Sequence, residues 1–367
     1  RVRSHKKFNT AVLIFPGGQR VDIATVRFEY YQYPAALPIV EFGSLKMDLY
    51  RRDFTVNTLA VDLNPRTFAQ LIDFFGGQRD LKEKMIRVLH NLSLVEDPTR
   101  ILRAIRFEQR FGFRIAKQTA NLIRTAVQMG LIQKLGGHRL FHELQLILME
   151  DNPLPALRRM GEYGVLAVLS RKMKFDTKME ELVTRINEVT SWHRLSFLDE
   201  PLEKWWVHFL GLLSALTPTE LEKAFGRLEL NSAQKERILW TYAQVRDLLG
   251  GFFLLPDPRP SDIYRALQPF RPEELLFMMA KTQREEVRKA ISHYFHRYRN
   301  VRTEVKGRDL RALGIPPGPV YRKVLDDLLT VRLNGEVRNR QEEIEYVERH
   351  YRELVPRKGL DSSSVSN

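Results

Sequence analysis

The sequence contains no cysteine in its 367 residues. This absence excludes disulfide bonds, thiolate zinc sites and catalysis by a cysteine nucleophile. No apolar run approaches the roughly 20 residues that a membrane-spanning helix needs, and the basic N-terminal residues lack the apolar core of a signal peptide. We therefore expect a cytoplasmic protein without a membrane partner.

Acidic residues are also in deficit. The chain has 59 Lys+Arg against 45 Asp+Glu, a formal net charge of +14. This excess indicates a polyanionic partner, with nucleic acid first, although a protein that is merely basic has the same composition. With 43% hydrophobic residues the chain can bury more than one core, and its length favours two to four domains.

Two short strands are predicted near the N-terminus. Residues 8–15 and 20–26 are rich in β-branched and apolar side chains and flank a Pro-Gly-Gly-Gln turn, the pattern of a β-hairpin. In the second strand Asp22 alternates onto the face of Ala24, so we expect small or apolar neighbours around its carboxylate. The chain opens at Arg1 without a methionine and reaches this hairpin almost at once, which indicates a segment of a longer protein.

Helical periodicity is predicted from Asp53 onward and dominates from about Thr67, interrupted by glycine and proline breaks. The predicted fold is therefore mostly α with a small N-terminal α/β part. The serine-rich residues 359–367 are predicted to be disordered.

The first candidate site is the block Arg51-Arg52-Asp53-Phe54-Thr55-Val56-Asn57. On a helix Asp53 and Asn57 would lie on one face a turn apart. The arginines beside them carry guanidinium forks suited to phosphate oxygens. The alternative is a helix cap at Asp53 with solvent-exposed arginines.

The second candidate site is residues 96–107. Asp97 followed by Pro98 predicts a helix start with Asp97 at the N-cap. Arg100, Arg103 and Arg106 recur at helical spacing and form a face opposite the apolar one, so Arg100 is expected near Asp97 across one turn.

Asp97 and Arg100 together could select a nucleobase. A carboxylate accepts a hydrogen bond from an exocyclic amino group, while a guanidinium donates to the neighbouring ring nitrogen or carbonyl. Adenine and cytosine offer that order of donor and acceptor. Uracil and guanine reverse it and would leave buried polar groups unpaired. Such a pair would select ATP and CTP.

The order of motifs along the chain carries a family resemblance. The matching segments are the hairpin and residues 37–60, Asp73-Phe74-Phe75-Gly76-Gly77 with Asp80-Leu81 and Arg87, residues 96–107, and Gly137 with residues 139–144. Over residues 8–145 this series resembles the class II tRNA nucleotidyltransferase and bacterial poly(A) polymerase family. The resemblance implies the C-terminal portion of a nucleotidyltransferase head (1–62), followed by a helical neck (63–148), body (149–250) and tail (251–358).

The resemblance also assigns roles to individual residues. Asp97 and Arg100 would read the incoming base, and Arg52, Asp53 and Asn57 would hold its sugar and triphosphate. Asp22 would be the family's third catalytic carboxylate, near the primer end. Two further arginines, Arg103 and Arg106, would line the same pocket or lock Asp97 in place. Structural support of the neck would come from Asp73, Asp80, Arg139 and Glu143.

The function implied is template-independent addition of CCA, or of the terminal A alone, to the tRNA 3′ end. Its substrates would be ATP, with CTP as a further candidate, and its partner the tRNA 3′ end and acceptor arm. Mg²⁺ would be the cofactor. The alternatives are a poly(A) polymerase of the same family and a non-catalytic RNA-binding module. The sequence does not define the oligomeric state.

One family motif has no counterpart in this sequence. The family's Gly-Gly-x-Val-Arg-Asp turn with a metal-binding Asp-x-Asp pair would precede the hairpin. Gly17-Gly18-Gln19-Arg20-Val21-Asp22 belongs to the hairpin turn, and no Asp-x-Asp follows it. Asp22 alone cannot supply a two-metal site, so the metal ligands stay unassigned.

A basic segment near the C-terminus is the candidate RNA-binding surface. Arg297, Arg299, Arg302, Lys306 and Arg308 are interleaved with aromatic residues such as Tyr294, Phe295 and Tyr298. Basic groups with aromatics suit an RNA backbone. A solvated helix face is the alternative.

Overall fold

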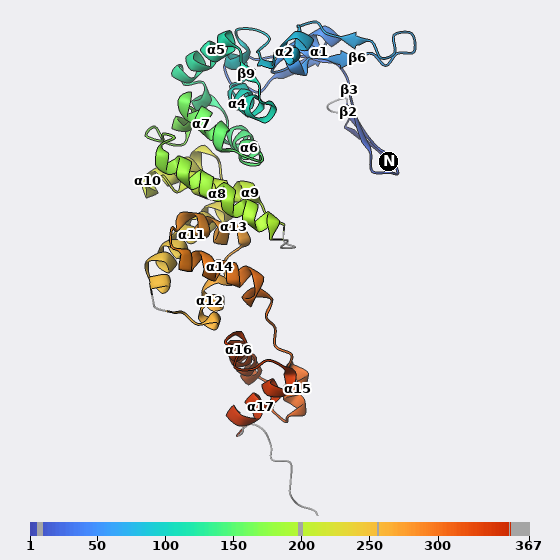
Figure 1. Cartoon of the computed structure of the whole chain (residues 1–367). Helices are drawn as coiled ribbons and strands as arrows, with labels where there is room; N and C mark the ends of the chain where they lie inside the picture. Colours follow the sequence, from blue (N-terminus) through green and yellow to red (C-terminus); the bar gives the residue numbers. More distant parts are fainter. Residues whose placement is uncertain (6–9, 197–200, 255–256, 352, 354–367) are drawn as a thin grey trace, which may run out of the picture. The chain divides into compact units, whose positions relative to one another are not determined.

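The computed structural model describes residues 1–5, 10–196, 201–254, 257–351 and 353. They form two compact units, one of Arg1–Thr184 with His208–Lys235 and the other of Arg185–Val207 with Glu236–Asn367. Helices predominate in both, and the strands are confined to the N-terminal part, as predicted (Figure 1). The predicted disordered residues 359–367 and the first two residues of the predicted hairpin lie outside the described residues.

The strands of the first unit form small, separate sheets. They are β1 (Val2–His5), β2 (Thr10–Ile14), β3 (Arg20–Ala24), β4 (Arg27–Tyr30), β5 (Ile39–Phe42), β6 (Ala60–Val61), β7 (Leu71–Ile72), β8 (Met85–Ile86) and β9 (Arg114–Ile115). The first sheet has the order β1-β2-β3, and the others are the pairs β4-β5, β6-β7 and β8-β9. Only β8 and β9 run parallel.

The predicted N-terminal hairpin is confirmed. Strands β2 and β3 pair antiparallel, with Ile14 opposite Arg20. The turn between them is closed by a hydrogen bond from the Phe15 N–H to the Gln19 carbonyl (2.9 Å). Gly18 has a φ of 80°, a left-handed conformation that glycine adopts without steric penalty.

The surroundings of Asp22 differ from the prediction. Residues two apart in a strand share a face, and Arg20 therefore lies beside Asp22. Arg20 Nη2 pairs with Asp22 Oδ1 at 2.8 Å, and the two side chains are 63% and 64% exposed. The expectation of small or apolar neighbours was wrong, because the residue on the N-terminal side of Asp22 on this face is a cation.

The helices of the first unit follow the small sheets. They are α1 (Leu45–Tyr50), η2 (Thr55–Asn57), α2 (Gly77–Lys82), α3 (Ser93–Glu96), α4 (Thr99–Phe111), α5 (Lys117–Gln128), η3 (Ile132–Lys134), α6 (Gly137–Leu148), α7 (Leu154–Glu162), η4 (Val165–Val168) and α10 (Pro218–Arg227). Three helices contribute residues to both units: α8 (Thr177–Leu195), α9 (Lys204–Leu213) and α11 (Ser232–Gly250).

The segment that carries Asp53 is extended, although its spacing predicted a helix. The helix lies earlier, since Ser44 caps α1 by accepting a hydrogen bond from the Met47 N–H (3.3 Å). Phe54 then forms an isolated β-bridge with Val88, and only the short η2 follows. The helical prediction was wrong here because Phe54 is fully buried in a strand-like pairing, which outweighs local spacing.

Helix α4 is buried on nearly every side. Its apolar residues Ile101, Leu102 and Ile105 are fully buried, and the helix packs against α6 and α7. Two of its three predicted arginines, Arg100 and Arg106, are also buried. An ionised side chain that leaves water needs partners, so the predicted arginine face must be satisfied by groups of the protein itself.

The start of α6 is held against α10 at Gly137. The Gly137 N–H donates to Glu229 Oε1 (3.0 Å), and a Cβ atom on this residue would lie 2.7 Å from the Arg227 carbonyl oxygen. Arg227 in turn donates through Nη1 to the Leu135 carbonyl (3.0 Å). These contacts set where α6, and with it the side chains on its first turns, begins.

The second unit is all helical in the residues described. Besides the shared helices it contains η5 (Phe252–Leu254), α12 (Pro260–Leu267), α13 (Pro272–Lys281), α14 (Glu285–His296), η6 (Tyr298–Asn300), α15 (Gly307–Ala312), α16 (Pro319–Leu333) and α17 (Arg340–His350). The last three helices share a small apolar core, and Glu343 is buried beside it. Glu343 is satisfied by the backbone N–H groups of Glu304 and Val305 and by Arg332.

None of the helices in the described ranges combines the length and the apolar composition that a bilayer crossing requires.

Candidate functional site

A pocket of about 630 Å³ in the first unit brings most of the predicted site residues together. Its lining residues are Glu29, Tyr31, Arg51, Arg52, Asp53, Asn57, Asp97, Thr99, Arg100, Arg103, Arg139, His142 and Glu143. The lining thus carries five arginines and four carboxylates, a polar surface suited to a charged ligand. Asp22 and Arg106 do not line it.

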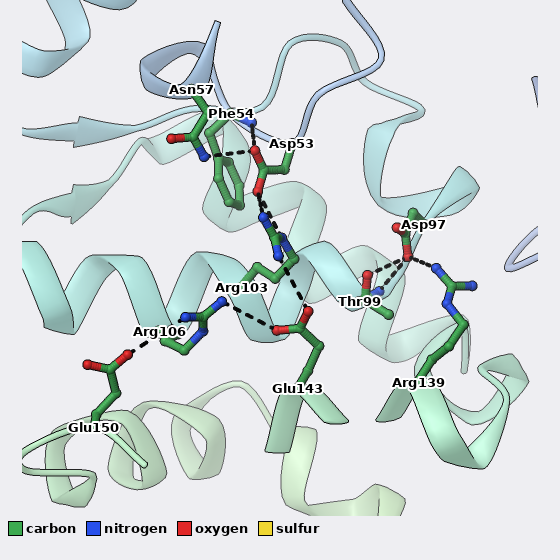
Figure 2. A network of polar contacts seen from close by, with 10 residues as sticks. All are labelled: Asp53, Phe54, Asn57, Asp97, Thr99, Arg103, Arg106, Arg139, Glu143 and Glu150. Carbon is green, nitrogen blue, oxygen red and sulfur yellow. Dashed lines mark hydrogen bonds and ion pairs between the residues drawn. The ribbon is translucent and has the colours of Figure 1, made fainter. Parts of the chain in front are cut away.

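Asp53 is the most fully bonded carboxylate of the pocket (Figure 2). Its Oδ1 accepts hydrogen bonds from the Phe54 N–H (2.9 Å) and from Asn57 Nδ2 (2.9 Å). Its Oδ2 accepts from Arg103 Nε (2.8 Å) and Nη2 (2.6 Å). The predicted pairing of Asp53 with Asn57 is therefore present, but it is made across a short turn instead of along a helix face.

Arg103 links Asp53 to helix α6. Its Nη1 donates to Glu143 Oε1 (3.4 Å), so one guanidinium contacts two carboxylates from different elements (Figure 2). Burial by itself would lower the pKa of Arg103, but the attraction of Asp53 and Glu143 outweighs it and raises that pKa. Arg103 lines the pocket, and its described partners are Asp53 and Glu143, not Asp97.

Arg106 points away from this pocket. It pairs with Glu143 Oε2 and with Glu150 Oε1, each at 3.7 Å, and its Nε has no hydrogen-bond partner among the described residues. It lines a neighbouring pocket instead of the one above. Both predicted roles for Arg106 were wrong, because one more helical turn carries the side chain past the pocket to the Glu143 and Glu150 carboxylates.

Asp97 is oriented through one of its two oxygens. Oδ1 accepts hydrogen bonds from the Thr99 N–H (3.0 Å), Thr99 Oγ1 (2.6 Å) and Arg139 Nη2 (2.7 Å). Within the described part of the chain, no residue donates to Oδ2. Asp97 thus satisfies an N–H at the start of α4, as the capping prediction requires, although the helix itself begins at Thr99. The residue that locks it is Arg139, to which sequence reasoning gave only a supporting role.

Arg100 is near Asp97 in the chain but is bonded elsewhere. Its Nη1 donates to Ser93 Oγ (2.5 Å) and to the Ser93 carbonyl (3.4 Å), and its Nη2 donates to the Arg51 carbonyl (2.6 Å). Among the described residues it makes no ion pair with Asp97. The guanidinium has five N–H donors and three described hydrogen bonds, so donors remain for a ligand.

Arg52 is the loosely held arginine of the pocket. Its side chain is 45% exposed, with Nη2 at 3.6 Å from Asp48 Oδ2 and Nη1 at 3.4 Å from the Asn57 carbonyl. Its neighbour Arg51 is tied more tightly, to Asp48 (2.9 Å) and Glu29 (3.1 Å). Arg52 is therefore the guanidinium that can turn toward an anionic ligand with the smallest loss of existing contacts.

Asp73 and Asp80 bond to neighbouring groups of the protein and do not line the pocket. Asp80 is fully buried, accepts a hydrogen bond from Thr55 Oγ1 (2.6 Å) and pairs with Arg87 (2.9 Å). Asp73 accepts from the Gly77 N–H (2.8 Å), and such backbone bonds offset burial and lower the pKa of its carboxyl group. These contacts hold the turn just beyond Asp53.

The residues present do not fit a magnesium site. Among the described residues there is no group of three or more histidine, cysteine or carboxylate side chains placed to hold a metal ion. Asp22 is exposed and paired with Arg20. No chemical step through a metal is therefore derived for these residues.

Sequence reasoning missed several residues that line the pocket. Glu29 and Tyr31 lie outside every pattern used above, and Thr99 and His142 lie inside matched segments without a predicted role, because single polar residues in a loop or on a helix give no local signal. His142 follows Arg139 by three residues on α6, so helical spacing places it near the same wall.

The predicted RNA-binding residues lie around η6 and the start of α15 in the second unit. Arg297, Arg302, Lys306 and Arg308 are exposed, and Arg299 is half-buried. Two of the interleaved aromatics, Tyr294 and Phe295, are buried and belong to the core. The expectation that these two would face RNA was wrong, because they lie on the packed side of α14.

Comparison with known proteins places these observations in one family. A model described as "Poly A polymerase head domain" matches residues 1–87, and one described as "Probable RNA and SrmB- binding site of polymerase A" matches residues 112–175. The A-adding tRNA nucleotidyltransferase of Geobacter sulfurreducens is 48% identical over 348 residues. That match covers 94% of this chain and 40% of the relative, so the chain spans well under half of the relative's length.

Solved structures resemble the chain over most of its length. A CCA-adding enzyme in apo form II has a TM-score of 0.78 and 36% identity, and the match covers 95% of this chain and 81% of that one. A CCA-adding enzyme in complex with ATP has a TM-score of 0.70 and 32% identity, with 99% and 82% covered.

Proposed function

Because the chain belongs to the family of class II tRNA nucleotidyltransferases and bacterial poly(A) polymerases, we propose that the intact protein adds nucleotides to the tRNA 3′ end without a template. The 48% identity to an A-adding relative favours addition of the terminal A from ATP over addition of the full CCA. In that reaction the primer 3′-oxygen forms a bond to the α-phosphorus of ATP and loses its proton. The bond between the α-phosphorus and the oxygen bridging to the β-phosphorus breaks, and pyrophosphate leaves. Mg²⁺ is the metal expected for the intact protein, and no residue described above is assigned to it.

The geometry of Asp97 is the observation that carries this proposal. One carboxylate oxygen is held by Thr99 and Arg139, and the other receives no described hydrogen bond while the side chain lines the pocket. An exocyclic amino group of adenine or cytosine can donate to that second oxygen. A remaining N–H of Arg100 would then meet the adjacent ring acceptor.

The sugar and phosphates would be held by the other wall of the pocket. Asp53 already accepts four hydrogen bonds, which is the full capacity of a carboxylate. We therefore assign it the positioning of Asn57 and Arg103. The Asn57 amide oxygen is left for a ribose hydroxyl, and the exposed Arg52 for the triphosphate.

RNA binding would use the second unit. The cationic side chains of Arg297, Arg299, Arg302, Lys306 and Arg308 would contact phosphates, with charge as the main attraction because two neighbouring aromatics are buried. In this scheme the chain divides into head (1–62), neck (63–148), body (149–250) and RNA-binding tail (251–358).

A poly(A) polymerase is the second candidate, favoured by the polymerase description of both matching family models. The two candidates differ in product. The intact protein would add a single adenosine to tRNA ending in CC in the first case and a long run of adenosines in the second.

The test of the pocket is a calorimetric titration of this chain with ATP, CTP, GTP and UTP. We expect ATP to bind more tightly than GTP and UTP, because guanine and uracil do not present an amino donor and a ring acceptor in the order that Asp97 and Arg100 require. Equal affinity for all four nucleotides would contradict base reading by Asp97. Absence of nucleotide binding would contradict the nucleotide pocket altogether.

A further inference from the structure

Tyr31, like His142, differs from the charged residues of the pocket in having no hydrogen bond to any described residue. The arginines and carboxylates of the lining are all paired with one another or with backbone groups. The Tyr31 side chain is half-buried, lines the same pocket, and makes no hydrogen bond to any residue that the structure describes. A hydroxyl left open in a pocket whose charged side chains are paired is available to a ligand.

The backbone on both sides holds Tyr31 in place. The preceding residue, Tyr30, ends β4 and lies opposite Ile39 of β5. After it the chain turns at Ala35, whose φ of 65° is unusual for a residue with a Cβ. The Ala35 N–H donates to the Val95 carbonyl (3.3 Å). Its own carbonyl accepts from Arg139 Nη1 (3.5 Å), from the same guanidinium that orients Asp97.

The Tyr31 phenol lines the same pocket as Asp97 and Arg100, the groups proposed to read the base, and their charges act on it. Burial raises the pKa of Tyr31, the charge of Arg100 opposes that effect, and Asp97 and Glu29 add to it. The hydroxyl therefore keeps its proton at neutral pH and can either donate or accept a hydrogen bond. Tyr31, Asp97 and Arg100 all line one pocket, so a single ligand in that pocket can contact all three side chains.

We propose that the Tyr31 hydroxyl is a third base-reading group, which hydrogen-bonds the nucleobase on the edge that Asp97 and Arg100 recognise. The inference rests on the proposed nucleotide pocket and extends it. It implies that selection of the base uses a residue of the β4–β5 connection in addition to residues of α4.

The experiment compares Tyr31→Phe with Tyr33→Phe in the full chain. The first substitution removes one oxygen atom and keeps the ring. The second makes the same change two residues along, at a side chain that is 65% exposed and outside the pocket lining. Each protein is titrated with ATP and with ribose 5-triphosphate, which lacks only the base, and circular dichroism verifies folding.

We expect Tyr31→Phe to lower the affinity for ATP about three- to tenfold, which corresponds to the loss of one hydrogen bond. The affinity for ribose 5-triphosphate should change less than about twofold. Tyr33→Phe should leave both affinities unchanged. Equal weakening of both ligands, or no weakening of either, would overturn the assignment. A wild-type chain that does not prefer ATP or CTP over GTP and UTP would refute base reading by Asp97, and one that binds none of the four would refute the nucleotide pocket. Both results are visible before any variant is made.

Discussion

The arginines of the pocket in the first unit and those of residues 297–308 in the second carry the same charge in opposite surroundings. Arg100 is buried and Arg103 partly so, and they donate to hydroxyl, carbonyl and carboxylate oxygens at 2.5–3.4 Å. Arg297, Arg302 and Arg308 are exposed. A guanidinium held by several hydrogen bonds fixes the positions of the side chains around it. An exposed guanidinium attracts a ligand by its charge, and salt screens that attraction. The comparison predicts different consequences when each kind is disturbed.

The largest effect is expected at Asp53. Asp53→Ala removes the main partner of Arg103 and leaves the Phe54 N–H and the Asn57 amide unpaired. We expect a loss of about 3 kcal/mol in the unfolding free energy of the first unit, together with at least a tenfold loss of ATP affinity. Urea unfolding and calorimetry measure the two quantities.

Asp22→Ala is the matched control for Asp53. It breaks an exposed pair with Arg20, so the expected change in unfolding free energy is below about 0.5 kcal/mol. If both substitutions had the same effect, the distinction between buried and exposed ion pairs in this unit would be wrong.

The second effect concerns selectivity at Asp97. Asp97→Asn can place an amide N–H where the base amino group would donate, so ATP affinity should fall about tenfold and GTP or UTP should gain relative to it. Glu96→Gln, one residue away and outside the pocket lining, is the control and should leave the order of the four nucleotides unchanged. An unchanged order in Asp97→Asn would end the base-reading proposal.

The third effect is expected in the second unit and tests charge alone. Arg308→Gln should weaken tRNA binding about threefold and make the slope of log affinity against log salt smaller by about 1, without changing the unfolding free energy. Arg246→Gln removes an equally exposed cation from α11 and should leave the slope as it is. Equal slopes in the two variants would show that residues 297–308 have no special place in RNA binding.

The smallest effect is a pH dependence from His90. Its ring stacks on Tyr50, and burial followed by repulsion from Arg100 lowers its pKa. The folded state therefore binds fewer protons than the unfolded state just below the usual histidine pKa of about 6.5, and stability falls as pH drops through that range. His90→Gln should flatten this slope by on the order of 2 °C in Tm between pH 7 and 5.5. His138→Gln, which changes a side chain that is 82% exposed, should leave the pH dependence of Tm as it is. Thermal unfolding of both variants between pH 7 and 5.5 checks the two expectations.

Local patterns predicted the elements and much of the pocket. The hairpin, the start of α4 near Asp97 and the mostly helical fold follow from alternation, capping residues and helical periodicity. Six of the eight residues predicted for catalysis or nucleotide binding line one pocket. The exceptions are Asp22 and Arg106.

The partners of those residues could not be predicted, because they lie far apart in the chain. Arg103 pairs with Asp53 across 50 residues, and Arg139 with Asp97 across 42. Arg100 reaches the Arg51 carbonyl across 49 residues, a contact with the backbone that leaves no trace in residue types. The helix predicted at Asp53 failed for the same reason, since the bridge between Phe54 and Val88 is a tertiary contact.

The hydrogen bonds from Thr99 and Arg139 to Asp97 determine how selectivity among nucleotides could be lost. Three hydrogen-bond donors fix the rotamer of Asp97 before any ligand binds. The side-chain entropy of Asp97 is therefore lost when the protein folds and is not lost again when a nucleotide binds. Substitutions that let the Asp97 side chain change rotamer, but keep both of its carboxylate oxygens, should therefore reduce the selectivity among nucleotides. Binding of the triphosphate should persist. The selectivity for the base would then depend on how rigidly the Asp97 side chain is held, which NMR relaxation of that carboxylate measures.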